Sequence, residues 1–301
     1  MGAGVGEDCA ALKLAPGETL ILSTDPITGT AKDIGSLAMQ ITLNDLASSG
    51  AEPVGVMLTV LLPEGTREIQ LKKIMAQVSE ACAKANVQVM GGHTEITPVV
   101  RQTLISVCGV GKVKDGCMIS TGGARPGMDI LVTKWIGIEG TAILAKEREA
   151  ELAKHFPPSF VEAAKGFDAY LSVCPEAAVA VKSGVCAMHD VTEGGIYGAL
   201  WEMAQASGVG LEIDLKKIPI RQETVEICEY FGIHPYKLIS SGCMLMAAAD
   251  GNHLVRELEK EGILATIIGK ATEGKDRVLL CEDERRFLEP PKTDELYQVI
   301  M

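Results

Sequence analysis

The sequence predicts an α/β protein of the α+β type with two domains, and three observations lead to that fold class. The chain has 301 residues, of which 47% are hydrophobic, which is enough to bury a large core. Short apolar runs rich in β-branched residues alternate with longer segments that have apolar residues at helical spacing. A stretch rich in Gly, Lys, Asp, Ser and Pro interrupts this alternation at residues 111–128. We therefore expect a junction there, between domains at residues 1–115 and 125–301.

In the first domain the expected order is strand, helix, strand, helix, strand, strand. Pro26 and Pro63 close the first two apolar runs, which favours strands, and Gly50 follows the first helical pattern as a stop signal. The expected elements are Thr19–Thr24, Ile34–Ser49, Val54–Leu62, Arg67–Asn86, Val87–Met90 and Leu104–Val110.

The second domain continues the alternation, and its longer periodic segments favour helices by their length. The expected strands are Asp129–Lys134, Val185–Asp190, Leu211–Ile213, Thr266–Gly269 and Arg277–Cys281, and Cys243–Ala249 is a further apolar run. The expected helices are Gly140–His155, Pro158–Ser172, Ile196–Ser207, Gln222–Phe231 and His253–Glu261.

The charge and cysteine content exclude several classes of protein. With 28 basic and 40 acidic side chains the net charge is −12, which argues against binding to nucleic acid or an anionic membrane. Nine cysteines, odd in number and without a C-x-x-C pair, indicate reduced and mostly buried thiols rather than disulfides or a zinc site. No apolar run approaches the roughly 18 residues that span a bilayer, so a cytoplasmic location is the default expectation.

Acidic and amide side chains in the first domain are candidates for a metal and phosphate site. Asp8 lies in a glycine turn, Asp25 directly follows a predicted strand, and Asn44-Asp45 lie in a predicted helix among apolar neighbours. Carboxylates gathered without cations repel one another unless a divalent ion is bound, and Mg²⁺ takes carboxylate oxygens together with phosphates. The alternatives are that Asp8 and Asp25 are turn or cap residues and that Asn44-Asp45 lie on a solvated helix face.

Two glycine pairs follow predicted strands. Gly91-Gly92, followed by His93-Thr94, would let a ligand approach the backbone, although a tight turn would use the same glycines. The second pair, Gly194-Gly195, stands between His189-Asp190 at a strand end and a helix, so free backbone N–H groups would face an anion. The alternatives there are that Asp190 caps the helix and that His189 is structural.

Taken in order, these motifs resemble the aminoimidazole ribonucleotide (AIR) synthetase superfamily, whose fold is called PurM-like, and most closely its HypE-like branch and the AIR synthase-related proteins. The likeness covers nearly the whole chain. The matching motifs are Gly6–Leu12, Thr24–Ile27, Asn44–Pro53, Gly91–Glu95, His189–Gly195 and Ser240–Gly242.

The resemblance implies an ATP-using homodimer in which the sheets of two N-terminal domains pair into a shared β-barrel, with a C-terminal α/β domain beside it. ATP and Mg²⁺ would bind in the cleft at that interface. The metal ligands would be Asp8, Asp25 and Asp45, and the catalytic residues would be His189 and Asp190. The cofactor would be held by the same three carboxylates together with Asn44, Gly91, Gly92, His93, Thr94, Gly194 and Gly195.

The implied chemistry is phosphorylation or activation of an oxygen on a small-molecule or protein-borne substrate. HypE proteins carry their substrate on a C-terminal cysteine, whereas the last cysteine here, Cys281, lies in a predicted strand, so the substrate is left open. A second hypothesis is a non-catalytic nucleotide-binding scaffold in a metalloenzyme-maturation complex. A dinucleotide oxidoreductase, suggested by the Gly-x-Gly-x-Gly of residues 2–6, is a third and weaker idea.

Overall fold

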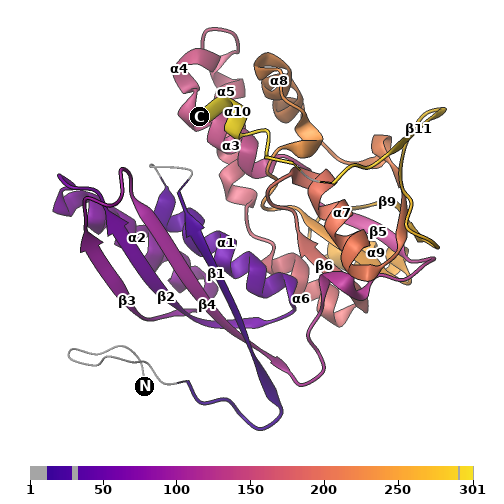
Figure 1. Ribbon diagram of the computed structural model, residues 1–301, viewed down its shortest axis with the longest axis horizontal. Coiled ribbons are helices and arrows are strands. Elements are labelled where there is room, and N and C mark those ends of the chain that lie inside the picture. The colour runs from indigo at the N-terminus through magenta and orange to yellow at the C-terminus, as the bar shows by residue number, and fades with distance from the viewer. Residues whose placement is uncertain (1–11, 29–32, 291, 301) are drawn as a thin grey trace. The chain divides into compact units, whose positions relative to one another are not determined.

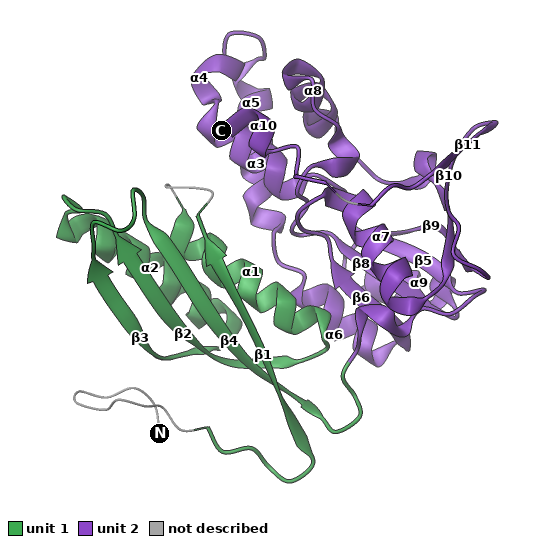
Figure 2. Cartoon of the chain, viewed as in Figure 1, with its two compact units in different colours: residues 1–118 green, residues 119–301 purple. Residues whose placement is uncertain are grey.

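The computed structural model describes residues 12–28, 33–290 and 292–300, and the chain divides into two compact units, unit 1 at residues 1–118 and unit 2 at residues 119–301 (Figure 1, Figure 2). Each unit combines one β-sheet with helices, which confirms the expected α/β class. In the described part of the chain, no helix is both long enough and apolar enough to span a membrane.

Unit 1 is a four-stranded sheet with two helices on one face (Figure 1). Its elements are β1 (Glu18–Ile27), α1 (Ile34–Ser48), β2 (Glu52–Leu62), α2 (Glu68–Ala85), β3 (Gln88–Ile96) and β4 (Leu104–Lys114). The strand order is β1-β4-β2-β3, with only the β2–β3 pair parallel. Both expected helices are confirmed to within a residue at each end, while β1 and β3 run on past their expected ends.

Helix α1 packs closely on the sheet because its apolar stripe meets a glycine of β4. A Cβ at Gly109 would stand 2.4 Å from the Thr42 side chain, so only glycine permits this approach. Helix α2 buries a narrower stripe, Ile74, Val78 and Cys82, and ends at Asn86 in the left-handed conformation that commonly terminates helices. The helix-covered face of the sheet therefore carries the core of unit 1.

Unit 2 contains a seven-stranded mixed sheet in the order β11-β10-β7-β9-β5-β8-β6. Its strands are β5 (Asp129–Thr133), β6 (Val185–Asp190), β7 (Gly210–Asp214), β8 (Met244–Ala248), β9 (Ala265–Thr272), β10 (Arg277–Cys281) and β11 (Glu284–Phe287). Its α-helices are α3 (Ile138–Glu147), α4 (Glu149–Leu152), α5 (Pro158–Lys165), α6 (Cys174–Lys182), α7 (Gly195–Ser207), α8 (Gln222–Phe231), α9 (Gly251–Lys260) and α10 (Tyr297–Ile300). Short 3₁₀ turns are η1 (Thr121–Gly123), η2 (Gly166–Tyr170), η3 (Leu215–Lys217) and η4 (Pro235–Lys237).

The centre of this sheet is buried on both faces. Ile130, Leu131 and Val132 are consecutive in β5 and all fully buried, and successive strand residues point to opposite faces. Ile130 and Val132 pack with α7, while a second apolar cluster joins α3, α4, α5 and α8. Among the strands and α-helices of unit 2, α6, β11 and α10 have no counterpart among the elements expected from the sequence.

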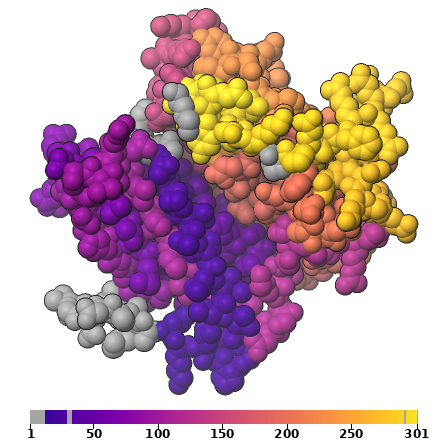
Figure 3. All heavy atoms as spheres, in the orientation of Figure 1, coloured from indigo at the N-terminus to yellow at the C-terminus, as the bar shows by residue number. Residues whose placement is uncertain are grey.

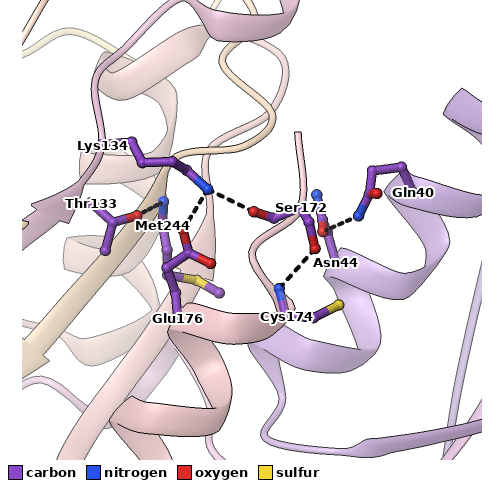
Figure 4. Close-up of polar contacts among 8 residues, drawn as sticks. All are labelled: Gln40, Asn44, Thr133, Lys134, Ser172, Cys174, Glu176 and Met244. Carbon is purple, nitrogen blue, oxygen red and sulfur yellow. Dashed lines mark hydrogen bonds and ion pairs between the residues drawn. The ribbon is translucent and has the colours of Figure 1, made fainter. Parts of the chain in front are cut away.

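A buried ion pair fastens α6 to the end of β5 (Figure 4). Lys134 Nζ donates to Glu176 and, at 2.6 Å, to the carbonyl oxygen of Ser172. The side chains of Lys134 and Glu176 are only 12% and 3% exposed. Removing either partner would leave an uncompensated charge buried, so the contact depends on both side chains together.

The cysteines in the described part of the chain are free thiols, and they are less buried than the sequence predicts. Of the eight that the structure describes, Cys82, Cys228 and Cys243 are buried, four are half-buried and Cys117 is exposed. Burial raises the pKa of Cys243 to about 12, which keeps that thiol protonated and unreactive.

Candidate functional site

Two of the predicted metal carboxylates lie on neighbouring elements of unit 1. Ser23 of β1 donates its hydroxyl hydrogen bond to Asp45 of α1, so the strand and the helix meet at this point. Asp25 lies on the same face of β1 as Ser23, because side chains two residues apart share a face, and their Cα atoms are about 7 Å apart. Asp25 and Asp45 are both half-buried. The fold thus brings two carboxylates and a hydroxyl to one region between β1 and α1.

Asp25 lies inside its strand, not after it, which corrects the sequence-based expectation. β1 extends to Ile27, and Asp25 is paired with Val107 of β4. Pro26 does not break the strand, because β1 is at the edge of the sheet, where a missing N–H is tolerated. Among the described residues Asp25 has no hydrogen-bond or ion-pair partner, so its carboxylate is available to a ligand.

Asn44 is fully buried in α1 and accepts a hydrogen bond from Gln40 Nε2 at 3.1 Å (Figure 4). The apolar residues on either side of Asn44 predicted that this amide would be buried, and it is.

Asp8, the third predicted metal ligand, lies outside the described residues. Within those residues, no three His, Cys, Asp or Glu side chains come close enough to hold a metal ion by themselves.

The first glycine pair lies inside a strand and not after one, so the tight-turn reading of the sequence is wrong. Gly91 and Gly92 lie within β3 and pair with Met57 and Leu58 of the parallel strand β2, next to a register shift. A Cβ at Gly92 would stand 2.1 Å from the Leu58 carbonyl oxygen, and its φ of +152° also suits glycine. The close approach that this glycine permits is therefore that of a neighbouring strand.

His93 and Thr94 continue β3 along the edge of the sheet, and both are exposed. His93 Nε2 lies 3.6 Å from Glu95 Oε2 in a solvent-exposed pair. Contacts of this kind contribute little to stability, so neither side chain is held in place by the described residues around it.

The two predicted catalytic residues, His189 and Asp190, point to opposite faces of one strand. His189 and Asp190 are successive residues of β6 and so point to opposite sides. His189 Nε2 lies 2.7 Å from Glu202 Oε2 of α7, whereas Asp190 is buried and faces Glu139 of α3, whose pKa it helps to raise. The structure therefore does not direct both side chains at one reacting atom.

The amides of the second glycine pair already have acceptors within unit 2. Gly194 N donates to Asp294 Oδ2 at 2.7 Å, and Gly195 N donates to the Thr192 carbonyl oxygen at 3.1 Å. Asp294 begins the C-terminal strap, residues 294–300, which lies at the surface of unit 2 (Figure 3, yellow). A carboxylate of the chain thus occupies the position predicted for a phosphate.

Sequence reasoning missed two buried acids beside Asp190, namely Glu139 and Asp294, each only 3% exposed. Burial is the main cause that raises the pKa of Glu139 to about 7, and burial also raises the pKa of Asp294. The only available signal was an acid within an apolar stretch, Ile136–Leu144 in the case of Glu139. Perturbed acids of this kind are concentrated at functional sites.

Comparison with known proteins gives the family. Residues 6–113 match the model of the AIR synthase related protein N-terminal domain, and residues 125–282 match that of the C-terminal domain. Carbamoyl dehydratase HypE of Cupriavidus necator is 32% identical over 259 residues, which cover 83% of this chain and 72% of that protein.

Two solved structures share the fold. Hydrogenase maturation protein HypE in complex with ATP has a TM-score of 0.82 at 22% identity, covering 97% of this chain and 90% of that one. HypE in a HypE–HypF complex has a TM-score of 0.78 at 23% identity, covering 92% of each chain. The chain therefore belongs to the AIR synthase related family, has the PurM-like fold and is a HypE-like protein.

Proposed function

We propose that this protein is an ATP- and Mg²⁺-dependent enzyme that phosphorylates or otherwise activates an oxygen of its substrate. The observation that carries the proposal is the hydrogen bond from Ser23 of β1 to Asp45 of α1, which brings Asp45 next to the strand face that also carries Asp25. Two kinds of likeness support it: a relative that is named a carbamoyl dehydratase, and a neighbour of the same fold in complex with ATP.

The side chains in unit 1 fit Mg²⁺. They offer hard oxygen donors, two carboxylates and a hydroxyl, and Mg²⁺ in nucleotide sites is held by one or two carboxylates while phosphates and water complete its shell. Asp25 and Asp45 would hold the ion, with Asp8 as the third predicted ligand. When bound, Mg²⁺ supplies charge neutralisation for the transferred phosphoryl group. The role of the chain is to orient the two carboxylates, because Ser23 restricts the Asp45 side chain.

Isothermal titration with ATP plus Mg²⁺ tests this assignment. We expect binding in the parent, and a loss of about tenfold or more in Asp25→Asn and Asp45→Asn, because each removes one of two carboxylates from the ion. The amide in Asp45→Asn keeps an oxygen acceptor for Ser23, so the packing of α1 on β1 is preserved. Asp115→Asn is the matched control, since Asp115 accepts from Thr19 elsewhere in unit 1. No binding, or equal binding in all variants, rejects the proposal.

The nucleotide site as proposed also includes a second copy of the chain. The face of the unit 1 sheet that is not covered by helices carries Leu20, Leu22 and Met57, which are 41%, 61% and 41% exposed. Leu22 pairs with Val110 of β4, and Met57 of β2 pairs with Cys108 of β4. Val110 and Cys108 are two residues apart, as are Leu20 and Leu22, so all these side chains point to the same face. Apolar side chains gathered on one face are typical of protein–protein interfaces, and the proposed occupant is the same face of a second copy.

Sedimentation velocity tests the dimer with Leu22→Glu. We expect a dimer in the parent and a monomer in the variant, because two glutamates would be buried in a symmetric interface. Val99→Glu, at an exposed residue outside the strands, serves as the control and should remain dimeric. A monomeric parent would remove the second copy from the proposed site.

A non-catalytic accessory role is the second candidate function, and one observation favours it. A neighbour of the same fold was solved as a HypE–HypF complex, so that protein acts with a protein partner. Release of ADP separates the two functions. Turnover that depends on Asp45, with carbamoyl, formyl or thiamine substrates, supports the enzyme, whereas Mg·ATP binding without ADP release from any of them supports the accessory role.

A further inference from the structure

Strand β11 (Glu284–Phe287) leaves one edge of the unit 2 sheet open. It is the last strand in the order of the sheet and pairs with β10, and within the described part of the chain no strand pairs with its outer side. Its residues are all exposed, and the strand lies at the margin of unit 2 (Figure 2). An open edge presents unpaired N–H and C=O groups that can pair with a further strand.

The hydrogen-bond pattern shows which backbone groups of β11 are free. The strand pairs with β10 in an antiparallel register, and just beyond it Leu288 N donates to the Arg277 carbonyl oxygen at 2.8 Å. Hydrogen-bonded and non-hydrogen-bonded pairs alternate along an antiparallel ladder, so the backbone groups of Arg286, like those of Leu288, face β10. The N–H and C=O groups of Arg285 and Phe287 therefore point outward, two residues apart.

The side chains of Arg285 and Phe287 lie on one face of the β10–β11 hairpin. Leu279, which pairs with Arg286, belongs to the core cluster that packs with α7, so the neighbours of Arg286 in sequence point to the opposite face. Phe287 is 64% exposed there. Arg286 is paired with Glu284, whereas the Arg285 side chain has no ion pair or hydrogen bond with any described residue. The open edge thus carries one unneutralised cation and one exposed aromatic ring.

Charge excludes a second copy of the chain as the occupant of this edge. In every symmetric antiparallel pairing of two β11 strands that matches three or more of the four residues, Arg285 or Arg286 stands opposite an arginine of the other copy. Like charges directly opposite each other in a ladder are destabilising. The arginines therefore act against self-association, which an exposed aromatic ring on an open edge would otherwise favour.

We propose that β11 is a strand-addition site for an extended segment of a partner protein, with an acidic side chain opposite Arg285 and an apolar side chain opposite Phe287. Main-chain hydrogen bonds to the open edge supply the affinity, and these two side chains supply the specificity. The acid offsets the free charge of Arg285, and the apolar side chain covers the exposed ring of Phe287. The proposal goes beyond the proposed function and does not depend on where ATP binds.

Fluorescence anisotropy of a labelled hexapeptide, Thr-Glu-Thr-Leu-Thr-Thr with blocked ends, tests the proposal on the full chain. The glutamate and the leucine are two residues apart, so they can face Arg285 and Phe287 together. We expect saturable binding by the parent and slower amide hydrogen exchange at these two residues. The same peptide with N-methyl groups on its glutamate and leucine cannot donate the main-chain hydrogen bonds, and should bind about tenfold or more weakly.

A charge exchange identifies the side-chain contact. Arg285→Glu should bind the peptide about tenfold more weakly than the parent does, because two like charges then stand opposite each other. The same variant should bind Thr-Lys-Thr-Leu-Thr-Thr more tightly than the parent binds it. Arg256→Glu, an equal charge change at an exposed arginine of α9, is the matched control and should bind both peptides like the parent.

No peptide binding by the parent, or equal binding of the N-methylated peptide, overturns the proposal even if a variant does not fold. An unchanged peptide preference in Arg285→Glu also overturns it. Sedimentation velocity of Phe287→Asp tests the remaining occupant: if this variant loses an association that the parent shows, a second copy covers the edge and the proposal is wrong. Mg·ATP binding should be the same in all these variants, so a failure of the nucleotide site is seen separately.

Discussion

Both units gather carboxylates, but they bury them to different degrees. In unit 1, Asp25 and Asp45 are half-buried and lie beside a hydroxyl. In unit 2, Glu139 and Asp294 are each 3% exposed, and other acids are their nearest charges. A half-buried acid keeps access to water and metal ions, whereas a buried acid among acids is driven toward its neutral form. The difference suits unit 1 to a metal–phosphate ligand, whereas the buried acids of unit 2 make stability depend on pH.

Within unit 2, the buried acid Glu176 has a cation beside it, Lys134, whereas the buried acid Glu139 has none among the described residues. Removing that cation gives the largest predicted loss of stability. Lys134→Met leaves Glu176 buried without its cation and should lower the free energy of unfolding by about 3–5 kcal/mol. Chemical denaturation measures the loss. Lys72→Met removes an exposed pair with Glu68 and should cost less than about 0.5 kcal/mol. Equal losses in the two variants would show that burial does not govern these pairs.

Glu139 should make stability fall as pH rises. Its folded pKa of about 7 lies above its ordinary value of 4.5, so the native state binds more protons than the unfolded state between these values. Stability from this group is full at low pH and is lost between pH 4.5 and 7. The raised pKa of Asp294 acts in the same direction.

Glu139→Gln isolates the contribution of this group. From pH 5 to pH 8 the parent should lose about 2–3 kcal/mol of unfolding free energy relative to the variant, as the pKa difference requires. Urea denaturation of both proteins at the two pH values measures it. A parent–variant difference that stays constant with pH would mean that Glu139 is ionised throughout this range and would contradict the prediction.

The two glycines of β3, Gly91 and Gly92, should differ in how much stability is lost when each is replaced by alanine. Gly92→Ala should destabilise the protein by about 2–3 kcal/mol, because the added Cβ meets the Leu58 carbonyl oxygen at 2.1 Å. Gly91→Ala meets nothing closer than 4.0 Å and should cost about 1 kcal/mol or less. Thermal unfolding of the two variants tests the difference, and similar melting temperatures would contradict a close approach at Gly92.

The smallest effect concerns His189. Its contact with Glu202 is partly exposed, with side chains 21% and 46% exposed, so His189→Gln should change stability by less than about 1 kcal/mol. If His189 is catalytic, as the sequence suggests, turnover falls by far more than the affinity for Mg·ATP. A change confined to stability would show that His189 is structural and would reject its catalytic role.

Most of the fold could be predicted from local patterns. Strand β6 and helix α8 begin and end at the residues expected, because strong apolar periodicity and punctuating residues mark both. β11 could not be predicted, since its four residues are all exposed and carry no alternating pattern. The strand stays extended because it pairs with β10, a contact between neighbouring strands that periodicity does not reveal.

The candidate site was predictable only where a residue's role follows from its own neighbours in sequence. Asn44 is buried as its apolar neighbours indicate. The partners of Gly92 and Gly194, by contrast, are Leu58 and Asp294, which lie far away along the chain. A glycine pair signals that something approaches the backbone closely, but whether it is a ligand, a strand or a carboxylate depends on tertiary structure.

The most direct test of the proposed nucleotide site compares a carboxylate of each unit. Mg·ATP is titrated into the parent, Asp45→Asn and Glu139→Gln at pH 8. We predict that Asp45→Asn loses about tenfold or more in Mg·ATP affinity, while Glu139→Gln binds Mg·ATP like the parent. If the two variants weaken Mg·ATP binding equally, the half-buried carboxylates of unit 1 do not form the metal site and the account is wrong.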